Sequence, residues 1–505
     1  MDSDLQSVQQ ARDLVTRARA AQERLSLFTQ KQADAVCAAM AEAGFREAER
    51  LAKLAVEETQ MGRVDSKTFK NTFCTRDLWA AMKDMPTCGI VRRDDKNMVY
   101  EIAEPMGVVA AIVPMTNPTS TALYKILIAL KSRNAIVVSP HPRAARCIAE
   151  SCRVMLEAAL KAGAPDGCIG CLTTVTLEGT TELMRHKLTS VILSTGGEGI
   201  VKAAYSSGKP AYGVGPGNVP VFIEKSADAR QAVKCIVESQ LFDYGTVCAS
   251  EQSVIVEAPI ADAVREEFRR QKAYFVTPDE KKKMEPVVIK GSLHNPDVVG
   301  QPAPKIAKMC GFAVPDDTTV LIVEMKTVGP QEPISREKLC PVLGFYVEPD
   351  WHAGCERSLQ VLRFGGMGHT LVIHSRNPEV IMEFALKKPA YRLCVNTGST
   401  QGAIGASTRL FPSMSLGCGT SGGNISADNI GPQHLVNVKR LAFDLAGDPF
   451  ASQMKVTDQV SDFVPFQREK GPEKPAAAPA GKPYTPAEME QMLLYNGRKR
   501  DVRSL

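Results

Sequence analysis

Hydrophobic and polar positions along the chain follow two different periods. From about Gln6 to Met82, apolar residues recur at helical spacing between charged stretches. From Val108 on, short β-branched runs alternate with amphipathic helical segments, and a second region of this kind begins near Val219. Strands separated by helices of this length indicate βαβ units and parallel sheets. We therefore predict an α/β protein with two doubly wound domains, of which the first is interrupted and later resumed.

Composition excludes several classes of protein. The 505 residues suggest two or three domains, and 44% hydrophobic with 23% charged residues exclude a disordered, collagen-like or coiled-coil chain. The net charge of +5 comes without a dense basic stripe, which argues against a nucleic-acid binder. The N-terminus lacks a secretory pattern, and the longest apolar run, 107–115, has about half the length of a membrane-spanning helix. With only 14 cysteines, we expect a cytoplasmic protein with reduced thiols.

The C-terminal part of the chain has a different character. Residues 471–483 are rich in Pro and Ala and indicate a semi-extended linker. The segment 485–488 has the pattern of a helix N-terminus, and Met489, Met492 and Leu493 then form a short apolar stripe. Two interpretations stay open: a frayed tail, or a docking or encapsulation peptide on a flexible tether.

Two motifs carry less chemistry than their spacing suggests. The glycine-rich segment 213–217 leads into a strand rather than a helix, so it is not a dinucleotide-binding fingerprint. Its glycines indicate a tight turn or a close approach of the backbone. Cys168 and Cys171 have the spacing of a zinc or redox pair, but no second pair of this spacing accompanies them. We interpret them as buried structural thiols and expect no metal site.

Cys248 is the candidate nucleophile. It lies in a turn between a probable helix, 232–241, and the strand 253–256. Asn117 directly follows an apolar strand, where side chains reach the crevice at the carboxyl end of a parallel sheet. An amide at that place can donate a hydrogen bond to a developing oxyanion. Glu337 precedes another strand-like run.

Together these segments resemble the aldehyde dehydrogenase superfamily over about residues 5 to 445. Within it the chain is most similar to the coenzyme-A-acylating members, including those of ethanolamine- and propanediol-utilising microcompartments. The resemblance implies an aldehyde dehydrogenase-like fold, with Cys248 as the nucleophile, Asn117 as the oxyanion donor and Glu337 as the contact of the nicotinamide ribose. The further cofactor-binding residues that it implies are Pro114, Met115, Thr116, Ser139, Pro140, His141, Ser194, Thr195, Gly196, Gly197 and Gly215.

Two departures from the hydrolytic members shape the expected reaction. Those members carry a Glu that activates water, whereas the corresponding residues here, 212–218, include no carboxylate. Without that base we expect slow attack by water, so the thiolate of coenzyme A becomes the better acyl acceptor. Pro142 stands where many hydrolytic members hold the adenosine ribose with a Glu. Because Arg143 tolerates a 2′-phosphate, NADP stays open beside NAD as the cofactor.

The resemblance implies the reaction of a short-chain aldehyde, propanal or acetaldehyde, with coenzyme A and NAD to give acyl-CoA and NADH. A thioester on Cys248 is the intermediate. Sulfoacetaldehyde as the substrate, and a hydrolytic enzyme, stay open as alternatives. A bifunctional aldehyde–alcohol dehydrogenase would need a further domain pair, for which we expect no room in 505 residues.

The resemblance also implies partners and domains. We expect a homodimer or homotetramer formed through a small β arm, no nucleic-acid or membrane partner, and a location inside a bacterial microcompartment if the C-terminal helix binds a shell protein. The expected domains are 1–87, the N-terminal helical part of the cofactor domain; 88–223, the Rossmann-like NAD-binding domain with an arm strand near 88–103; 224–425, the catalytic domain; 426–465, the return to the cofactor domain and the arm, with a strand near 436–443; 466–484, the linker; and 485–505, the C-terminal helix.

Overall fold

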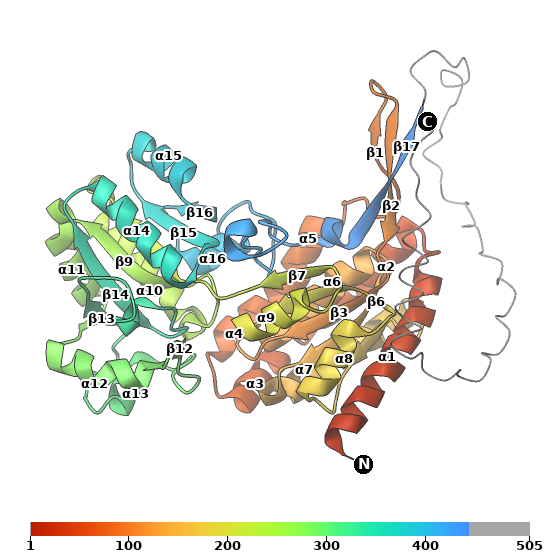
Figure 1. Cartoon of the computed structure of the whole chain (residues 1–505), viewed down its shortest axis with the longest axis horizontal. Helices are drawn as coiled ribbons and strands as arrows, with labels where there is room; N and C mark the ends of the chain where they lie inside the picture. Colours follow the sequence, from red (N-terminus) through yellow and green to blue (C-terminus); the bar gives the residue numbers. More distant parts are fainter. Residues whose placement is uncertain (1, 444–505) are drawn as a thin grey trace, which may run out of the picture. The chain divides into compact units, whose positions relative to one another are not determined.

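The computed structural model describes residues 2–443, and helices make up the first part of this range (Figure 1). In the first helix Ala11, Val15 and Ala18 are fully buried at helical spacing, so the predicted helical segment is confirmed. The helical elements here are α1 (Ser3–Leu25), α2 (Gln30–Arg46), α3 (Ala48–Thr59), α4 (Val64–Thr72), the π-helical η1 (Phe73–Asp77) and α5 (Leu78–Met82).

A five-stranded parallel sheet follows, in the order β5-β4-β3-β6-β7. Every residue of β3 and β4 is buried, as expected for central strands that helices cover on both faces. The strands are β3 (Val108–Val113), β4 (Ala135–Pro140), β5 (Ile169–Cys171), β6 (Thr189–Thr195) and β7 (Ala211–Val214). The connecting helices are α6 (Pro118–Lys131), η2 (Pro142–Ala144), α7 (Ala145–Lys161), α8 (Leu177–Arg185) and α9 (Glu198–Tyr205).

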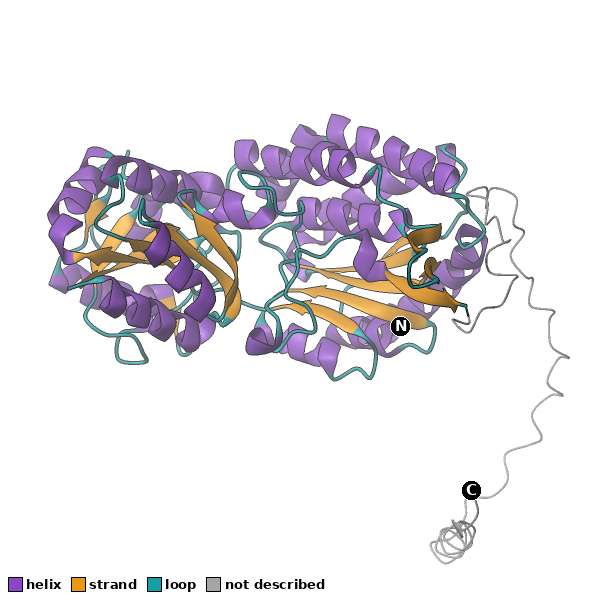
Figure 2. Cartoon of the chain, turned by 90° about the horizontal axis from the view of Figure 1, so that it is seen from above, coloured by secondary structure: helices purple, strands orange, loops and turns teal. Residues whose placement is uncertain are grey.

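A second parallel sheet has seven strands in the order β10-β13-β14-β9-β8-β15-β16. Figure 2 shows helices on both faces of each parallel sheet, so the predicted pair of doubly wound α/β domains is confirmed. The strands are β8 (Val219–Ile223), β9 (Glu251–Glu257), β10 (Tyr274–Phe275), β13 (Leu321–Glu324), β14 (Val342–Glu348), β15 (Gly368–His374) and β16 (Ala390–Val395). The expected domain boundary after residue 223 differs from this arrangement, because β8 pairs with β9 and β15 of the seven-stranded sheet.

Helices and short elements complete this part of the chain. The longer helices are α10 (Ala229–Leu241), α11 (Ala261–Arg270), α12 (Pro278–Val288), α13 (Ala303–Met309), α14 (Trp351–Gly365), α15 (Pro378–Lys387) and α16 (Ser399–Ile404). The short elements are η3 (Phe242–Gly245), η4 (Ala258–Ile260), η5 (Pro333–Ser335), η6 (Thr420–Gly422), η7 (Pro432–Leu435) and the hairpin of β11 (Ile289–Lys290) and β12 (Leu293–His294).

A small antiparallel sheet joins two distant segments. It has the order β1-β2-β17, formed by β1 (Gly89–Asp94), β2 (Val99–Pro105) and β17 (Val436–Ala442). These are the segments predicted as arm strands. The structure thus pairs them with each other within one chain, and their use in oligomerisation stays a prediction.

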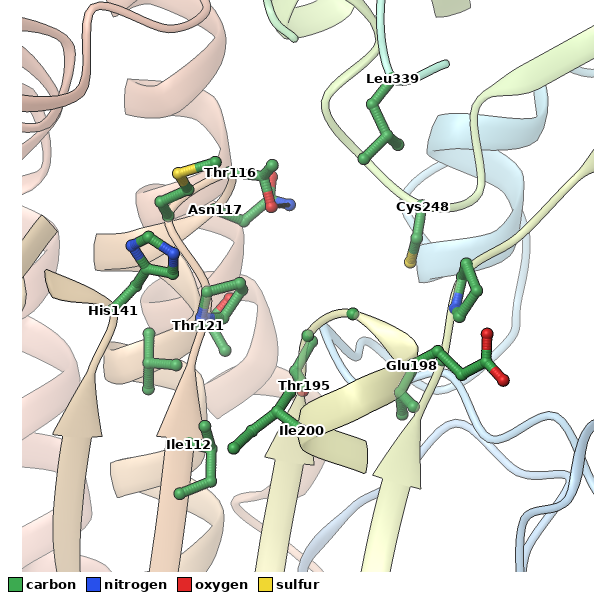
Figure 3. Close-up of a pocket in the computed structure, with 18 of the residues that line it drawn as sticks. Ile112, Thr116, Asn117, Thr121, His141, Thr195, Glu198, Ile200, Cys248 and Leu339 are labelled. Atoms are coloured by element: carbon green, nitrogen blue, oxygen red, sulfur yellow. Dashed lines mark hydrogen bonds between the residues drawn. The ribbon is translucent and has the colours of Figure 1, made fainter. Parts of the chain in front are cut away.

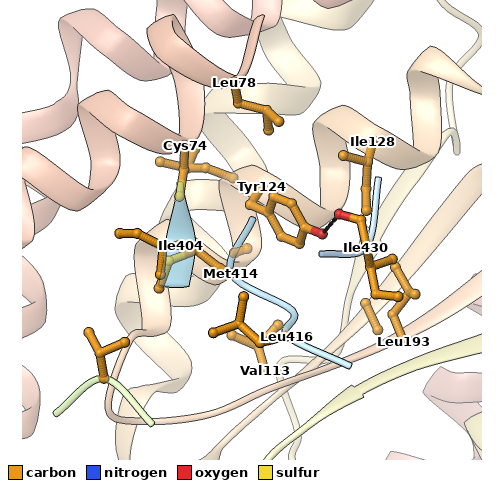
Figure 4. Packing of buried hydrophobic residues seen from close by; sticks show 14 of the residues in the cluster. Cys74, Leu78, Val113, Tyr124, Ile128, Leu193, Ile404, Met414, Leu416 and Ile430 are labelled. Atoms are coloured by element: carbon orange, nitrogen blue, oxygen red, sulfur yellow. Dashed lines mark hydrogen bonds between the residues drawn. The ribbon is translucent and has the colours of Figure 1, made fainter. Parts of the chain in front are cut away.

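Residues after the seven-stranded sheet return to the part of the chain that forms the five-stranded sheet. Figure 4 shows Tyr124 of α6 packed among Ile404, Met414 and Leu416, with its hydroxyl donating to the carbonyl oxygen of Ile430. This packing places the segment 404–430 against the helix that follows β3. It therefore lets one segment contact both the core of the first sheet and the cavity described below.

No helix within residues 2–443 is long and apolar enough to cross a membrane. The expected linker, 466–484, and C-terminal helix, 485–505, lie outside the described residues.

Candidate active site

A cavity of about 630 Å³ lies at the carboxyl ends of the five-stranded sheet and reaches Cys248. This is the crevice where parallel α/β sheets bind their ligands. Most of the sequence-predicted site residues line it: Pro114, Met115, Thr116, Asn117, Ser139, Pro140, His141, Thr195, Gly196, Gly197, Gly215, Cys248 and Glu337. Ser194 differs, because it is fully buried below the cavity wall as part of β6.

Cys248 occupies the turn between η3 and β9, and its side chain is partly exposed. Figure 3 shows Cys248 and Asn117 facing each other across the cavity. Desolvation, followed by the nearby Glu337, raises the pKa of the Cys248 thiol to about 12. At neutral pH the thiol therefore holds its proton, and its reaction as a nucleophile requires a base.

Asn117 is positioned by the start of a helix. It is the N-cap of α6, and Pro118 at the first helical position fixes the entry of the chain. Its amide nitrogen donates to the carbonyl oxygen of Thr246 at 3.1 Å and to the hydroxyl of Thr116 at 3.2 Å. Its amide oxygen accepts from Lys70 at 2.5 Å. The amide is therefore held in one orientation with its nitrogen toward the turn that carries Cys248.

The glycine-rich turn 213–217 lies against Cys248. A Cβ atom at Gly217 would be 2.4 Å from the Cys248 carbonyl oxygen, so the predicted close approach of the backbone is confirmed. The Gly217 N–H donates to Glu337 Oε1 at 2.8 Å. Desolvation raises the pKa of Glu337 to about 8 despite this hydrogen bond. Glu337 is thus a buried carboxyl group that titrates near neutral pH at the cavity wall.

The other end of the cavity fits a dinucleotide. Ser139 and His141 lie at the end of β4, and Thr195 to Gly197 form the turn between β6 and α9. A Cβ atom at Gly197 or Gly215 would meet no atom within 4 Å, so the backbone there is open to the cavity and can approach a phosphate closely. The Ser194 hydroxyl has no hydrogen-bond partner among the described residues. These residues suit a nicotinamide cofactor at this edge of the sheet.

Several residues near the cavity were not found by sequence reasoning. Lys67 and Lys70 lie on α4, within the segment that sequence analysis described only as apolar residues between charged stretches, and both are buried. His369 is the second residue of β15 and belongs to no sequence motif. Its Nε2 has no partner within residues 2–443. Its ring would lie 3.0 Å from a Cβ at Gly217. Only the closeness of distant segments in the fold reveals these side chains.

The thiol pair predicted to be structural lies on the edge of the first sheet. Cys168 is buried and Cys171 is partly exposed. In the described range 2–443, no group of three His, Cys, Asp or Glu side chains is arranged to hold a metal ion.

Comparison with known proteins places the chain in a family. Residues 3–297 match the model of the aldehyde dehydrogenase family. The bifunctional aldehyde-alcohol dehydrogenase AdhE of Escherichia coli K12 is 44% identical over 434 residues, which cover 85% of this chain and 49% of AdhE. The chain therefore spans about half the length of this curated relative.

Two solved structures match the chain over nearly their whole length. An acetylating aldehyde dehydrogenase from Geobacillus thermoglucosidasius is 50% identical with a TM-score of 0.87, covering 89% of this chain and 99% of that one. A propionaldehyde dehydrogenase from the fucose utilisation microcompartment of Clostridium phytofermentans is 27% identical with a TM-score of 0.78, covering 86% and 97%. The sequence match, the fold and the cavity around Cys248 agree: this chain belongs to the aldehyde dehydrogenase family.

Proposed function

We propose that the chain is a coenzyme-A-acylating aldehyde dehydrogenase that converts propanal or acetaldehyde, with coenzyme A and NAD, into acyl-CoA and NADH. One observation carries the proposal. The Cys248 thiol and the Asn117 amide face one cavity, while the turn 213–217 beside the thiol presents backbone instead of a carboxylate. The half-identical acetylating enzyme of G. thermoglucosidasius supports it.

In the first half-reaction the Cys248 thiol loses its proton to a base, and its sulfur attacks the aldehyde carbonyl carbon. The Asn117 amide and the backbone N–H of Cys248 stabilise the resulting oxyanion, and one such donor contributes on the order of 3 kcal/mol. Because Asn117 Nδ2 already donates to Thr246 and Thr116, the oxyanion replaces the longer contact, to the Thr116 hydroxyl. A bound nicotinamide ring supplies the hydride acceptor, and a thioester remains on Cys248.

The second half-reaction transfers the acyl group to coenzyme A and needs a base for the incoming thiol. His369 is the candidate. Burial, followed by the charge of Arg392, holds its pKa well below the ordinary value, so the imidazole is neutral at neutral pH. Its Nδ1 pairs with the Thr370 hydroxyl at 2.9 Å, and its Nε2 is unpaired in the described part of the chain. The ring and the carbonyl oxygen of Cys248 both lie within 3.0 Å of the position that a Cβ atom on Gly217 would take.

In this proposal the residues at the ends of β3, β4 and β6 would hold the nicotinamide cofactor. Ser139, Pro140 and His141 would hold the adenosine ribose, Thr195, Gly196 and Gly197 would hold the pyrophosphate, and Glu337 would hold the nicotinamide ribose. Pro142 at the cavity wall offers no carboxylate to the ribose hydroxyls, so the site suits NAD without repelling a 2′-phosphate. The five-stranded sheet then forms the cofactor domain, and the seven-stranded sheet forms the catalytic domain.

A hydrolytic enzyme is the second candidate, and one observation favours it. Glu337 is a carboxyl group at the cavity wall whose pKa, about 8, suits a general base near neutral pH. In that case water takes the place of coenzyme A as the acyl acceptor. The requirement for coenzyme A therefore separates the two functions.

The test is NADH formation from propanal and NAD, with and without coenzyme A. Wild type, Cys248→Ala and Cys235→Ala are compared; Cys235 on α10 is partly exposed and does not line the cavity. We expect steady NADH formation only with coenzyme A, loss of it in Cys248→Ala, and unchanged rates in Cys235→Ala. Equal rates without coenzyme A would show that water is the acceptor. Sulfoacetaldehyde in place of propanal tests the alternative substrate.

Assembly forms a further part of the proposal. The β1-β2-β17 sheet serves as an oligomerisation arm in a homodimer or homotetramer, and the 485–505 segment docks on a microcompartment shell protein. The similarity to a microcompartment propionaldehyde dehydrogenase supports this location. Deleting the residues after Gln467 tests it: unchanged co-purification with shell proteins would rule out targeting by this segment, and sedimentation of the full chain measures its oligomeric state.

A further inference from the structure

Three charged side chains lie fully buried behind the cavity wall. Lys67 and Lys70 are neighbours one turn apart on α4, and both contact Asp243 in η3. Lys67 Nζ is 2.8 Å from Asp243 Oδ2, and Lys70 Nζ contacts the same oxygen. The side chains are 1%, 0% and 0% exposed in this order. Burying charged groups this deeply costs desolvation free energy, so each of them needs a partner in the folded chain.

The two lysines reach the turn that carries the proposed oxyanion donor. Lys70 Nζ donates to Asn117 Oδ1 at 2.5 Å, and Lys67 Nζ donates to the carbonyl oxygen of Thr116 at 3.0 Å. Each ammonium group therefore bridges Asp243 and one residue of this turn. The amide oxygen of Asn117 is held by a charged donor, which is stronger than a neutral one.

Asp243 connects the same cluster to the loop of the nucleophile. Its Oδ2 accepts from the Thr246 hydroxyl at 2.6 Å, two residues before Cys248. The carbonyl oxygen of Thr246 accepts in turn from Asn117 Nδ2 at 3.1 Å. The hydrogen bonds thus close a ring through Lys70, Asn117, Thr246 and Asp243. One network holds the two residues that the proposed reaction needs on opposite walls of the cavity.

The backbone around Asp243 is unusual in a way that fits this role. Asp243 and Tyr244 have φ values of 54° and 51°, a region that residues other than glycine rarely adopt. A Cβ atom at Gly62 would lie 1.9 Å from Asp243 Oδ1, and the next residue, Arg63, donates its backbone N–H to that oxygen at 2.7 Å. Such a conformation persists only where its surroundings hold it in place. The position of the carboxylate is therefore built into the fold.

The cluster also has a charge that acts on Asn117. Two ammonium groups and one carboxylate leave one positive charge in excess, next to the Asn117 amide oxygen. Desolvation lowers the pKa of Lys70 to about 8. The charge of Asp243 opposes this shift, and the charge of Lys67 adds to it. Cys74 is the other titratable group that faces Lys70. A cation on the oxygen of an amide polarises the group, so its N–H becomes a better donor.

We propose that Lys70 is a positioning residue for acylation of Cys248. It holds the Asn117 amide with its nitrogen toward the developing oxyanion and polarises it. Asp243 and Lys67 keep the loop that carries Cys248 in a fixed position relative to that amide. The inference rests on the proposed function only in requiring that Cys248 be acylated. It does not depend on whether the acyl acceptor is coenzyme A or water.

The test is acylation of Cys248 by p-nitrophenyl acetate without NAD or coenzyme A. The Cys248 thiol gives up its proton to the buffer, and its sulfur forms a bond to the acetyl carbon through a tetrahedral oxyanion. p-Nitrophenolate then leaves with the electron pair of the broken C–O bond. Its absorbance gives the acylation rate at saturating and at limiting ester. The variants are Lys70→Met, Lys70→Arg, Asn117→Ala and the double variant Lys70→Met with Asn117→Ala.

A matched control is available in the same half of the chain. Lys131 is as buried as Lys70 and pairs with Asp34 at 2.5 Å. Neither Lys131 nor Asp34 lines the cavity. Lys131→Met therefore removes a buried ammonium group at a comparable structural cost. Thermal unfolding of all variants shows which of them are folded.

We expect Lys70→Met to lower the saturated acylation rate about 10- to 100-fold, which is less than the roughly 100- to 1,000-fold loss for removal of an oxyanion donor itself. We also expect Lys70→Arg to recover part of this loss, Lys131→Met to retain the wild-type rate, and the double variant to be no slower than Asn117→Ala alone. Equal rates for Lys70→Met and Lys131→Met, or additive effects in the double variant, would overturn the inference.

Two further outcomes are decisive. If Lys70→Met does not fold, Thr246→Val, which removes only the hydrogen bond to Asp243, is combined with Asn117→Ala in the same cycle, and additive losses would again contradict the inference. If Cys248→Ala is acylated as fast as wild type, Cys248 is not the nucleophile and the inference falls. If wild type is acylated but makes no acyl-CoA from aldehydes, the proposed function fails while the inference stands.

Discussion

Gly217 and the carbonyl group of Cys248 touch each other so closely that no side chain fits between them. A Cβ atom on Gly217 would be 2.4 Å from the Cys248 carbonyl oxygen and 3.0 Å from the ring of His369. The N–H of the same glycine donates to Glu337. The residue Gly217 thus lies close to the backbone of the proposed nucleophile, to a buried imidazole and to a buried carboxyl group.

Gly217→Ala is expected to displace the Cys248 loop, because the new methyl group overlaps its backbone. A misplacement of about 1 Å at a reacting group lowers the rate by roughly 100-fold, and we expect a loss of kcat of this order. Gly199→Ala is the control, because a Cβ there meets no atom within 4 Å. It should keep wild-type kcat in the same NADH assay, whereas a fully active Gly217→Ala would show that the contact is not required.

The Cys248 thiol should react slowly at neutral pH in the free enzyme. With its pKa raised to about 12 by desolvation, the thiolate fraction grows about tenfold per pH unit below that value. We expect the rate of iodoacetamide labelling of Cys248, measured by peptide mass spectrometry, to rise steadily from pH 7 to about 10. A plateau near pH 7 would indicate a thiolate that is already formed.

Glu337→Gln should change how stability depends on pH. In the folded protein desolvation raises the pKa of Glu337 from 4.5 to about 8, so folding favours the protonated form. This contribution is fully present below about pH 4.5 and is lost as the pH rises through about 8. The midpoint temperature of thermal unfolding of wild type should therefore fall as the pH rises from about 4.5 to about 8. The fall should be smaller in Glu337→Gln.

The difference between the two proteins isolates Glu337 from neighbouring titrations, including that of Lys338, whose pKa desolvation lowers to about 7. Parallel profiles for wild type and Glu337→Gln would contradict a raised pKa. If wild type forms NADH without coenzyme A and Glu337→Gln does not, Glu337 serves as the base of a hydrolytic reaction.

His369→Ala separates the two half-reactions. If His369 accepts the proton of coenzyme A, its loss slows transfer of the acyl group, and general-base catalysis typically contributes about 10²- to 10⁴-fold. We expect a burst of NADH equal to one turnover followed by a slow steady state, measured by stopped flow. His374→Ala is the control, because that imidazole is also buried but lies at the far end of the same strand. A variant without a burst would assign His369 to the first half-reaction.

The class of fold and the residues at the centre of the site could be predicted from local patterns in the chain. Alternating strands and helices predict parallel sheets, and side chains directly after a buried strand meet at one edge of such a sheet. Asn117 and the 195–197 turn follow strands in this way, so their place at the cavity was predictable. Ser194 was predicted with that turn but is still part of the strand, is fully buried and is not among the residues that line the cavity.

The distant residues that surround these groups could not be predicted, because they depend on how the folded chain packs. Lys70 and Asp243 are separated by 173 positions, and nothing in the helical pattern of α4 distinguishes a buried lysine from a solvated one. Likewise, the raised pKa of Glu337 comes from burial below the Gly217 turn, which lies 120 positions away. Local periodicity reports which face of an element is buried, whereas the partner of a buried charge depends on how whole elements pack against each other.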